Sequence, residues 1–136
     1  MKIVISSDEH LPLIDVLLDE VQRRGHEARF IGPGDWPEVT RQAIEEIQQG
    51  RADEGIVLCW TGTGCSIVAN KMPGIRAALC VDAETAKGAR IWNHANVLAL
   101  SLRLTSPTIL KEILSSWFDT PFSTDAWNLQ QVKQIE

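Results

Sequence analysis

The chain has 136 residues, of which 44% are hydrophobic and 23% are charged, and its net charge is −5. That length favours one domain over residues 1–136, and the acidic balance gives no electrostatic basis for non-specific nucleic-acid binding. No apolar run reaches the roughly 20 residues that cross a membrane, and the first residues lack the apolar segment of a signal peptide. We therefore expect neither a membrane nor a nucleic-acid partner.

Short apolar runs alternate with amphipathic stretches along the whole chain. "KIVIS" and "NVLAL" predict buried strands, whereas apolar residues at helical spacing predict the helices between the strands. Gly25 and Gly50 end the first two helices, Asp82 fits the N-cap of a later one, and Ser106 with Pro107 opens another. The predicted order is strand 2–6, helix to Gly25, strand 28–31, helix to Gly50, strand 55–59, a short helix to about Lys71, a strand within "PGIRAALC", helix 83–92, strand 96–100, a helix from Pro107 and a last short helix from near Thr124 or Asp125.

This alternation of strands and helices predicts an α/β fold, a three-layer αβα Rossmann-like sandwich with a five-stranded parallel sheet and helices on both faces. In such sheets ligands bind beyond the carboxyl ends of the strands. The loops "SDEH", "CWTGTGCS" and "LRLTSP" are therefore expected around one crevice. We also expect the polar segment "WNHAN", just before the fifth strand, to join them there.

The loop within "GIVLCWTGTGCSIVANK" (residues 55–71) carries the strongest chemical signal. Gly62 and Gly64 permit a tight turn whose backbone N–H groups, at the start of a helix, can bind an anion or an oxyanion. A plain strand-to-helix turn that needs glycine explains the pattern equally well. The spacing matches neither a P-loop nor the dinucleotide fingerprint, because Lys71 follows Asn70 and position 67 is isoleucine.

The three cysteines, Cys59, Cys65 and Cys80, are odd in number and lack CxxC spacing, so they predict neither a disulfide framework nor a metal site. Reduced thiols are typical of a cytoplasmic protein. Cys65 lies near a helix N-terminus, which stabilises a thiolate, although a small buried apolar role remains open for all three. Asp8 is a candidate general base, hydroxyl acceptor or helix cap.

The stretch "GIVLCWTGTGCSIVANKMPGIRAALC" resembles the signature of the ribose-5-phosphate isomerase B family, which includes the galactose-6-phosphate isomerase subunits. There the run reads approximately G-x-x-x-C-G-T-G-x-G-x-S-I-A-A-N-K-x-x-G-I-R-A. "SSDEH", "WNHANVLALSLR" and "ILKEILSSWF" occur in the family's order and spacing, so the resemblance covers nearly the whole chain.

The resemblance implies an aldose–ketose isomerase that works through a cis-enediolate, without metal or cofactor, on a small sugar or sugar phosphate. It implies a homodimer, or a tetramer, with the site at the subunit interface. By position, Cys59 matches the catalytic base, and Cys65 stands where another branch of the family has an acidic base. The loop residues Thr61, Gly62, Thr63 and Gly64 are implied to hold the enediolate, with Thr61 among the catalytic residues, and Trp60 and Ser66 are expected to contact the substrate. The resemblance also implies that Asp8 binds sugar hydroxyls, that Asn93 contacts the substrate and that Arg103 of the neighbouring subunit helps bind the phosphate.

Several positions depart from the family pattern. Trp92 replaces the ring-opening histidine, and His94 stands two residues on as its candidate substitute. Glu9 and His10 follow Asp8, where a phosphate-binding histidine is usual, and "WNLQQ" places Trp127 and Gln131 where basic residues are expected. Losing arginines removes charge-assisted contacts to phosphate.

These departures predict an altered substrate: an unphosphorylated sugar, a shorter or already open-chain sugar phosphate, or a related ketose. Two alternatives to an isomerase stay open at this point. One is a non-catalytic sugar-binding or regulatory homologue, and the other is a redox or flavin-binding α/β domain.

Overall fold

The computed structural model describes residues 1–135, and its centre is a sheet of five parallel strands in the spatial order β2-β1-β3-β5-β4. The predicted α/β sandwich around a five-stranded parallel sheet is confirmed. Within the described residues no helix is both long and apolar enough to cross a membrane. The strands are β1 (Lys2–Ser7), β2 (Glu27–Ile31), β3 (Glu54–Cys59), β4 (Ala77–Leu79) and β5 (Val97–Ser101).

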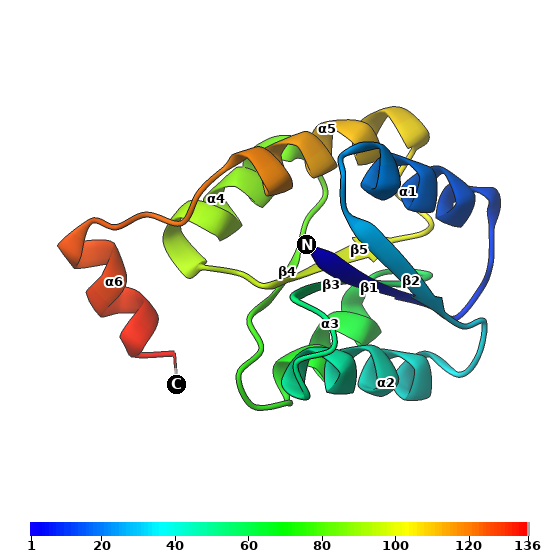
Figure 1. Cartoon of the computed structure of the whole chain (residues 1–136), viewed down its shortest axis with the longest axis horizontal. Helices are drawn as coiled ribbons and strands as arrows, with labels where there is room; N and C mark the ends of the chain where they lie inside the picture. Colours follow the sequence, from blue (N-terminus) through cyan, green and yellow to red (C-terminus); the bar gives the residue numbers. More distant parts are fainter. Residues whose placement is uncertain (136) are drawn as a thin grey trace.

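Helices cover both faces of the sheet, as Figure 1 shows. On one face lie α1 (Pro12–Arg23), α4 (Ala83–Asn93) and α5 (Pro107–Asp119), and on the other lie α2 (Trp36–Gln48) and α3 (Thr63–Asn70). The last helix, α6 (Ala126–Lys133), contacts α4 and stands to one side of the sheet (Figure 1).

The two faces of the sheet have separate apolar cores because successive strand residues point to opposite sides. Ile3 and Ile5 of β1 pack into the core under α1, α4 and α5, whereas Val4 packs into the core under α2 and α3. Strands buried on both faces read as continuous apolar runs, which is the pattern of "KIVIS" and "NVLAL".

The helix starts predicted from capping residues are confirmed. Asp82 accepts a hydrogen bond from the Thr85 backbone N–H at 2.8 Å, and Ser106 accepts one from the Ile109 N–H at 3.2 Å. Asp125 caps α6 in the same way. β4 is shorter than "PGIRAALC" suggested, and the Asn70 amide bonds both backbone groups of Ala77 along its outer edge. That contact shields an edge strand from further pairing.

The pairing of β3 with β5 shows which residues lie at the carboxyl edge of the sheet and which lie at the amino edge. Cys59, the last residue of β3, pairs with Ser101 at the end of β5, and Gly55 pairs with Val97 at its start. Since "WNHAN" ends where β5 begins, it lies at the amino edge of the sheet, about 13 Å of strand away from Cys59. Our expectation that this segment joins the crevice at the carboxyl edge is therefore wrong.

A buried ion pair ties the amino edge together. Glu54 accepts hydrogen bonds from Arg90 Nη1 and from Trp117 Nε1, both at 2.9 Å. Arg90 also donates to the Ala95 carbonyl at 2.7 Å, and its guanidinium lies 4.6 Å from the ring centroids of Trp117 and Phe122. This cluster links β3, α4 and α5 with the segment that leads to α6.

We predict that Glu54→Ala lowers the free energy of unfolding by about 3–5 kcal/mol, because it leaves the Arg90 charge buried without its carboxylate. Urea denaturation followed by circular dichroism measures this change. The matched control is Glu38→Ala, which breaks the exposed pair with Arg41 and should change the denaturation midpoint little. Equal losses in both variants would contradict a special role for the buried pair.

Candidate active site

A cavity of about 240 Å³ opens at the carboxyl edge of the sheet. It lies where β1 and β3 end and where α2 and α3 begin. Its lining is formed by Asp8, Trp36, Cys59, Trp60, Thr61, Thr63 and Gly64. Six of these seven residues are among the candidates from the sequence, so the predicted loop and Asp8 do meet at one place.

The loop that forms the floor of this cavity depends on Gly62. This residue is the N-cap of α3 with φ of +77°, and a Cβ there would lie 2.6 Å from Leu79 Cδ1 and 2.9 Å from the Leu100 carbonyl carbon. Both the left-handed backbone and the lack of space therefore require glycine. The turn brings the positive end of the α3 helix dipole to the cavity.

Contacts with the end of β5 hold the same loop in place. The N–H groups of Leu102 and Arg103 donate to the carbonyls of Cys59 and Trp60, each at 3.0 Å. The Ser101 hydroxyl adds a second bond to the Trp60 carbonyl at 2.9 Å. The chain segment after Cys59 is thus held against the end of β5.

Cys59 is the ionisable thiol of the cavity. It is 4% exposed at the end of β3, and its pKa is lowered to about 5. The chief cause is a hydrogen bond from the Cys65 thiol, helped by the backbone N–H groups of Cys65, Gly62 and Thr61, which together outweigh the cost of burial. The lowered pKa favours the thiolate form of Cys59.

The other two thiols are protonated. Donation to Cys59, burial and the neighbouring negative charge all raise the pKa of Cys65, whose Sγ also lies 3.3 Å from the Gly62 carbonyl oxygen. Burial, with the nearby Asp82 carboxylate, raises the pKa of Cys80 to about 12. Of the two thiols beside the loop, Cys59 is thus the one suited to accept a proton.

Asp8 reaches the cavity from the end of β1. Its Oδ1 atom is buried and has no hydrogen-bond partner among residues 1–135. A buried carboxylate oxygen without a partner is costly, and a ligand hydroxyl would satisfy it. It caps neither α1 nor α2, whose N-caps are Leu11 and Asp35.

Trp36 is a lining residue that the sequence analysis missed. It stands at the start of α2, and its ring covers Gly64, where a Cβ would come within 2.9 Å of two ring carbons. Gly32 makes this possible because it passes so close to the Ser7 carbonyl that any side chain would clash. The direction of the strands could have revealed Trp36. "GPGDWP" follows a parallel strand and so begins at the same edge as Cys59.

Some predicted residues lie near the cavity but do not line it. His10 Nε2 contacts Asp15 Oδ1 at 2.9 Å, and Glu9 is exposed. Ser66 is partly buried in α3. Arg103 is exposed at the carboxyl edge, and its backbone N–H is bonded to Trp60.

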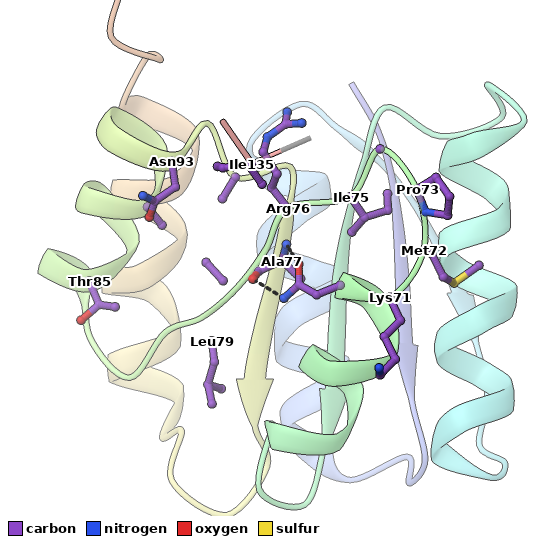
Figure 2. A pocket seen from close by; sticks show the side chains of 15 residues that line it. Lys71, Met72, Pro73, Ile75, Arg76, Ala77, Leu79, Thr85, Asn93 and Ile135 are labelled. Carbon is purple, nitrogen blue, oxygen red and sulfur yellow. Dashed lines mark hydrogen bonds between the residues drawn. The ribbon is translucent and has the colours of Figure 1, made fainter. Parts of the chain in front are cut away.

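Trp92, Asn93 and His94 lie far from this cavity in their own subunit. A groove of about 720 Å³ lies beside β4. Figure 2 shows Asn93 and Thr85 on one side of it and Met72 and Pro73 on the opposite side. His94 stacks on Phe122 with ring centroids 4.5 Å apart, and its Nε2 lies 3.0 Å from the Ser123 carbonyl oxygen. These contacts give His94 a structural part in holding the segment before α6.

No group of three or more His, Cys, Asp or Glu side chains in residues 1–135 is arranged to hold a metal ion. The chemical groups that do converge are a thiolate, a carboxylate, two threonine hydroxyls and the amino end of a helix. Such a set can remove a carbon-bound proton, stabilise the resulting oxyanion and bind hydroxyl groups.

Comparison with known proteins agrees with this chemistry. The sequence matches the Ribose/Galactose Isomerase family over residues 3–135. The structure superposes on ribose-5-phosphate isomerase B of Clostridium thermocellum with a TM-score of 0.92 and 35% identity, over 99% of this chain and 95% of that one. The chain therefore belongs to the Ribose/Galactose Isomerase family and is a sugar-phosphate isomerase.

Two proteins of similar sequence also have names that refer to sugar-phosphate isomerases. The chain is 45% identical over 87 residues to D-erythrulose-4-phosphate isomerase of Pectobacterium atrosepticum, a match that spans 64% of this chain and 57% of that protein. It is 36% identical over 135 residues to a putative sugar phosphate isomerase of Bacillus subtilis, over 90% of this chain and 87% of that one.

We predict that Cys65→Ala raises the pKa of Cys59 from about 5 towards the ordinary thiol value of 9.0, because it removes the main hydrogen-bond donor to the thiolate. The rate of alkylation by iodoacetamide, followed against pH, reports the thiolate fraction. In the parent protein this rate should fall only as the pH drops through about 5, whereas in the variant it should already fall below pH 9.

Both proteins in this experiment should carry Cys80→Ala so that Cys59 is the thiol that reacts. Mass spectrometry of the alkylated peptide confirms the site of modification. Superimposable pH profiles with and without Cys65 would contradict the assigned role of the Cys65 thiol.

Proposed function

We propose that this enzyme interconverts a short, acyclic ketose phosphate and its aldose isomer, with D-erythrulose 4-phosphate and D-erythrose 4-phosphate as the substrate pair. The observation that carries the proposal is that neither Trp92 nor His94 is suited to open a sugar ring. The position that the family resemblance assigns to ring opening holds Trp92, and the nearby His94 is engaged with Phe122 and Ser123.

The chemistry of a four-carbon sugar phosphate explains why no ring-opening base is needed. A furanose ring of a tetrose forms when O4 attacks the carbonyl carbon at C1. In the 4-phosphate O4 is esterified, and the remaining hydroxyls are too close to the carbonyl to close a stable ring. Such a substrate reaches the enzyme already open. The relationship to D-erythrulose-4-phosphate isomerase of Pectobacterium atrosepticum supports the same choice.

In the proposed reaction the Cys59 thiolate removes one proton from C1 of the ketose. The C1–H electron pair becomes the C1–C2 double bond, and the carbonyl pair moves to O2, which gives the enediolate. A proton passes from O1 to O2, and the Cys59 thiol returns its proton to C2 as the C1 carbonyl forms. The cycle is balanced and restores the thiolate. The lowered pKa of Cys59 keeps the base ionised at neutral pH.

The remaining groups of the cavity stabilise the enediolate or bind other parts of the substrate. The negative charge on O2 is stabilised by the amino end of α3, which begins at Thr63 and faces the cavity. Asp8, with its unpaired Oδ1, accepts a substrate hydroxyl. We assign the phosphate to the side of the cavity near Arg103, because the Arg103 backbone is bonded to Trp60 in the lining.

We further propose that the working enzyme is a homodimer in which a second copy completes each site. Asn93 lies at the opposite edge of the sheet from Cys59, so a contact with the substrate requires Asn93 of another subunit. The surface around Asn93 is suited to such a contact, because Trp92 is 59% exposed and Trp127 is 65% exposed. Apolar surface of this kind favours an interface.

We predict that the enzyme exchanges the C1 proton of D-erythrulose 4-phosphate in deuterated water and that Cys59→Ser slows this exchange by about 100-fold or more, since serine is a poor base at neutral pH. Proton NMR follows both the exchange and the isomerisation. Ribulose 5-phosphate and unphosphorylated erythrulose, run beside it, test chain length and the need for phosphate.

Two results would overturn this proposal. One is exchange with ribulose 5-phosphate but not with the four-carbon substrate. The other is equal exchange by the Cys59→Ser variant and its parent. Cys80→Ala serves as the matched control, because Cys80 is buried outside the cavity and should leave the exchange rate unchanged.

The shared site predicts complementation between two inactive variants. Cys59→Ser and Asn93→Ala proteins, each inactive alone, should regain up to about a quarter of the parental activity when they are unfolded, mixed in equal amounts and refolded. Half of the dimers are then mixed, and one of their two sites is intact. Steady-state rates measure the recovery. A mixture that stays inactive while mixed dimers form would contradict an interface role for Asn93.

A further inference from the structure

Two indole side chains form part of the wall of the candidate active site, and the catalytic scheme above leaves them without a role. Trp36 comes from the start of α2 and Trp60 directly follows Cys59, so they reach the cavity from two different loops. Both remain about half exposed, at 44% and 52%. Exposed indoles at the mouth of a small polar cavity are costly unless they contact a ligand or a partner.

The position of Trp36 is fixed by its surroundings. Its carbonyl accepts a hydrogen bond from the Thr40 hydroxyl at 2.7 Å, which anchors the first turn of α2. Its ring lies directly against Gly64, with no room for a side chain between them. The indole therefore covers the first turn of α3 and limits the cavity on that side.

The backbone of Trp60 is equally fixed, and its side chain lines the cavity while 52% of its surface stays exposed. The Trp60 carbonyl accepts hydrogen bonds from the Ser101 hydroxyl and the Arg103 N–H. The same residue thus connects the catalytic Cys59 to the proposed phosphate-binding Arg103. An indole at this point lies beside any substrate that extends from the thiolate towards that arginine.

We infer that Trp36 and Trp60 set the length of the substrate chain by closing the cavity around an extended four-carbon sugar phosphate. This inference rests on the proposed function and assigns its specificity to two residues. An indole face packs well against the C–H groups of an extended sugar carbon chain. A five-carbon sugar phosphate adds a further CHOH group between the reacting carbons and the phosphate, and its aldose form, ribose 5-phosphate, also closes into a furanose ring that is wider than the open chain. It fits only if an indole is displaced.

The test compares two substrates in the same protein preparation. For the parent enzyme, Trp60→Ala and Trp60→Phe, kcat/KM is measured with D-erythrulose 4-phosphate and with ribulose 5-phosphate. We expect Trp60→Ala to shift the ratio of the two values towards the five-carbon substrate by at least about tenfold, which is the scale on which pocket volume discriminates substrates. Trp60→Phe, which keeps an aromatic wall, should give an intermediate shift.

The ratio is insensitive to partial misfolding, because both values come from the same molecules. Trp36→Leu, which keeps an apolar contact with Gly64, should shift the ratio in the same direction. The matched control is Val81→Ala, which shortens an exposed apolar side chain outside the cavity and should leave the ratio unchanged.

The possible results separate this inference from the proposed function. A parent enzyme that is active on the four-carbon substrate supports the function, and an unchanged ratio in both tryptophan variants then overturns the inference alone. A parent enzyme that prefers ribulose 5-phosphate overturns both. A shift of the ratio in the Val81→Ala control as large as that in Trp60→Ala also overturns the assignment to the indoles.

Discussion

The candidate site depends on one backbone constraint, the left-handed turn at Gly62. That turn ends β3 at Cys59 and starts α3 at Thr63, so it aims the amino end of a helix back at the last residue of a strand. The thiol of Cys65, in the first turn of α3, is the chief cause of the lowered pKa of Cys59. A side chain at position 62 would collide with Leu79 and the β5 backbone, and the thiolate would lose its donors. The start of α3 and the lowered pKa of Cys59 thus both depend on the glycine at position 62.

Much of this arrangement was predictable from the sequence, for identifiable physical reasons. Alternating apolar runs and helical stripes predict the layers, and Asp82, Ser106 and Asp125 predict helix starts because their side chains replace missing backbone partners. The glycine loop was found because a strand-to-helix turn needs particular residues, whereas Cys59 was assigned as the base from its match to the family signature. Local rules of this kind act over a few residues and are visible in one stretch of sequence.

What was missed depends on strand order and on distant partners. Trp36 was not predicted because only the arrangement of β2 beside β1 brings the start of α2 to the cavity. The segment "WNHAN" was expected at the wrong edge, since its position before β5 in the sequence was not translated into the direction of the strand. Glu54 reads as an ordinary charge at the start of a strand, and its burial with Arg90 and Trp117 joins residues far apart in the chain.

Several features that cost stability occur together at the cavity. Asp8 has a buried oxygen without a partner, Cys59 is ionised in a site that is largely shielded from water, and two indoles are half exposed beside them. Each feature costs free energy in the unliganded protein, and a hydroxylated, anionic substrate relieves the first and third by giving the carboxylate a donor and the indoles a surface. At the amino edge both oxygens of the Glu54 carboxylate accept hydrogen bonds, whereas Arg90 Nε in the same cluster is buried without a partner among residues 1–135. Buried groups without partners therefore occur at both edges of the sheet, and the carboxyl edge differs because its unpaired Asp8 oxygen belongs to a residue that lines a cavity together with the ionisable Cys59.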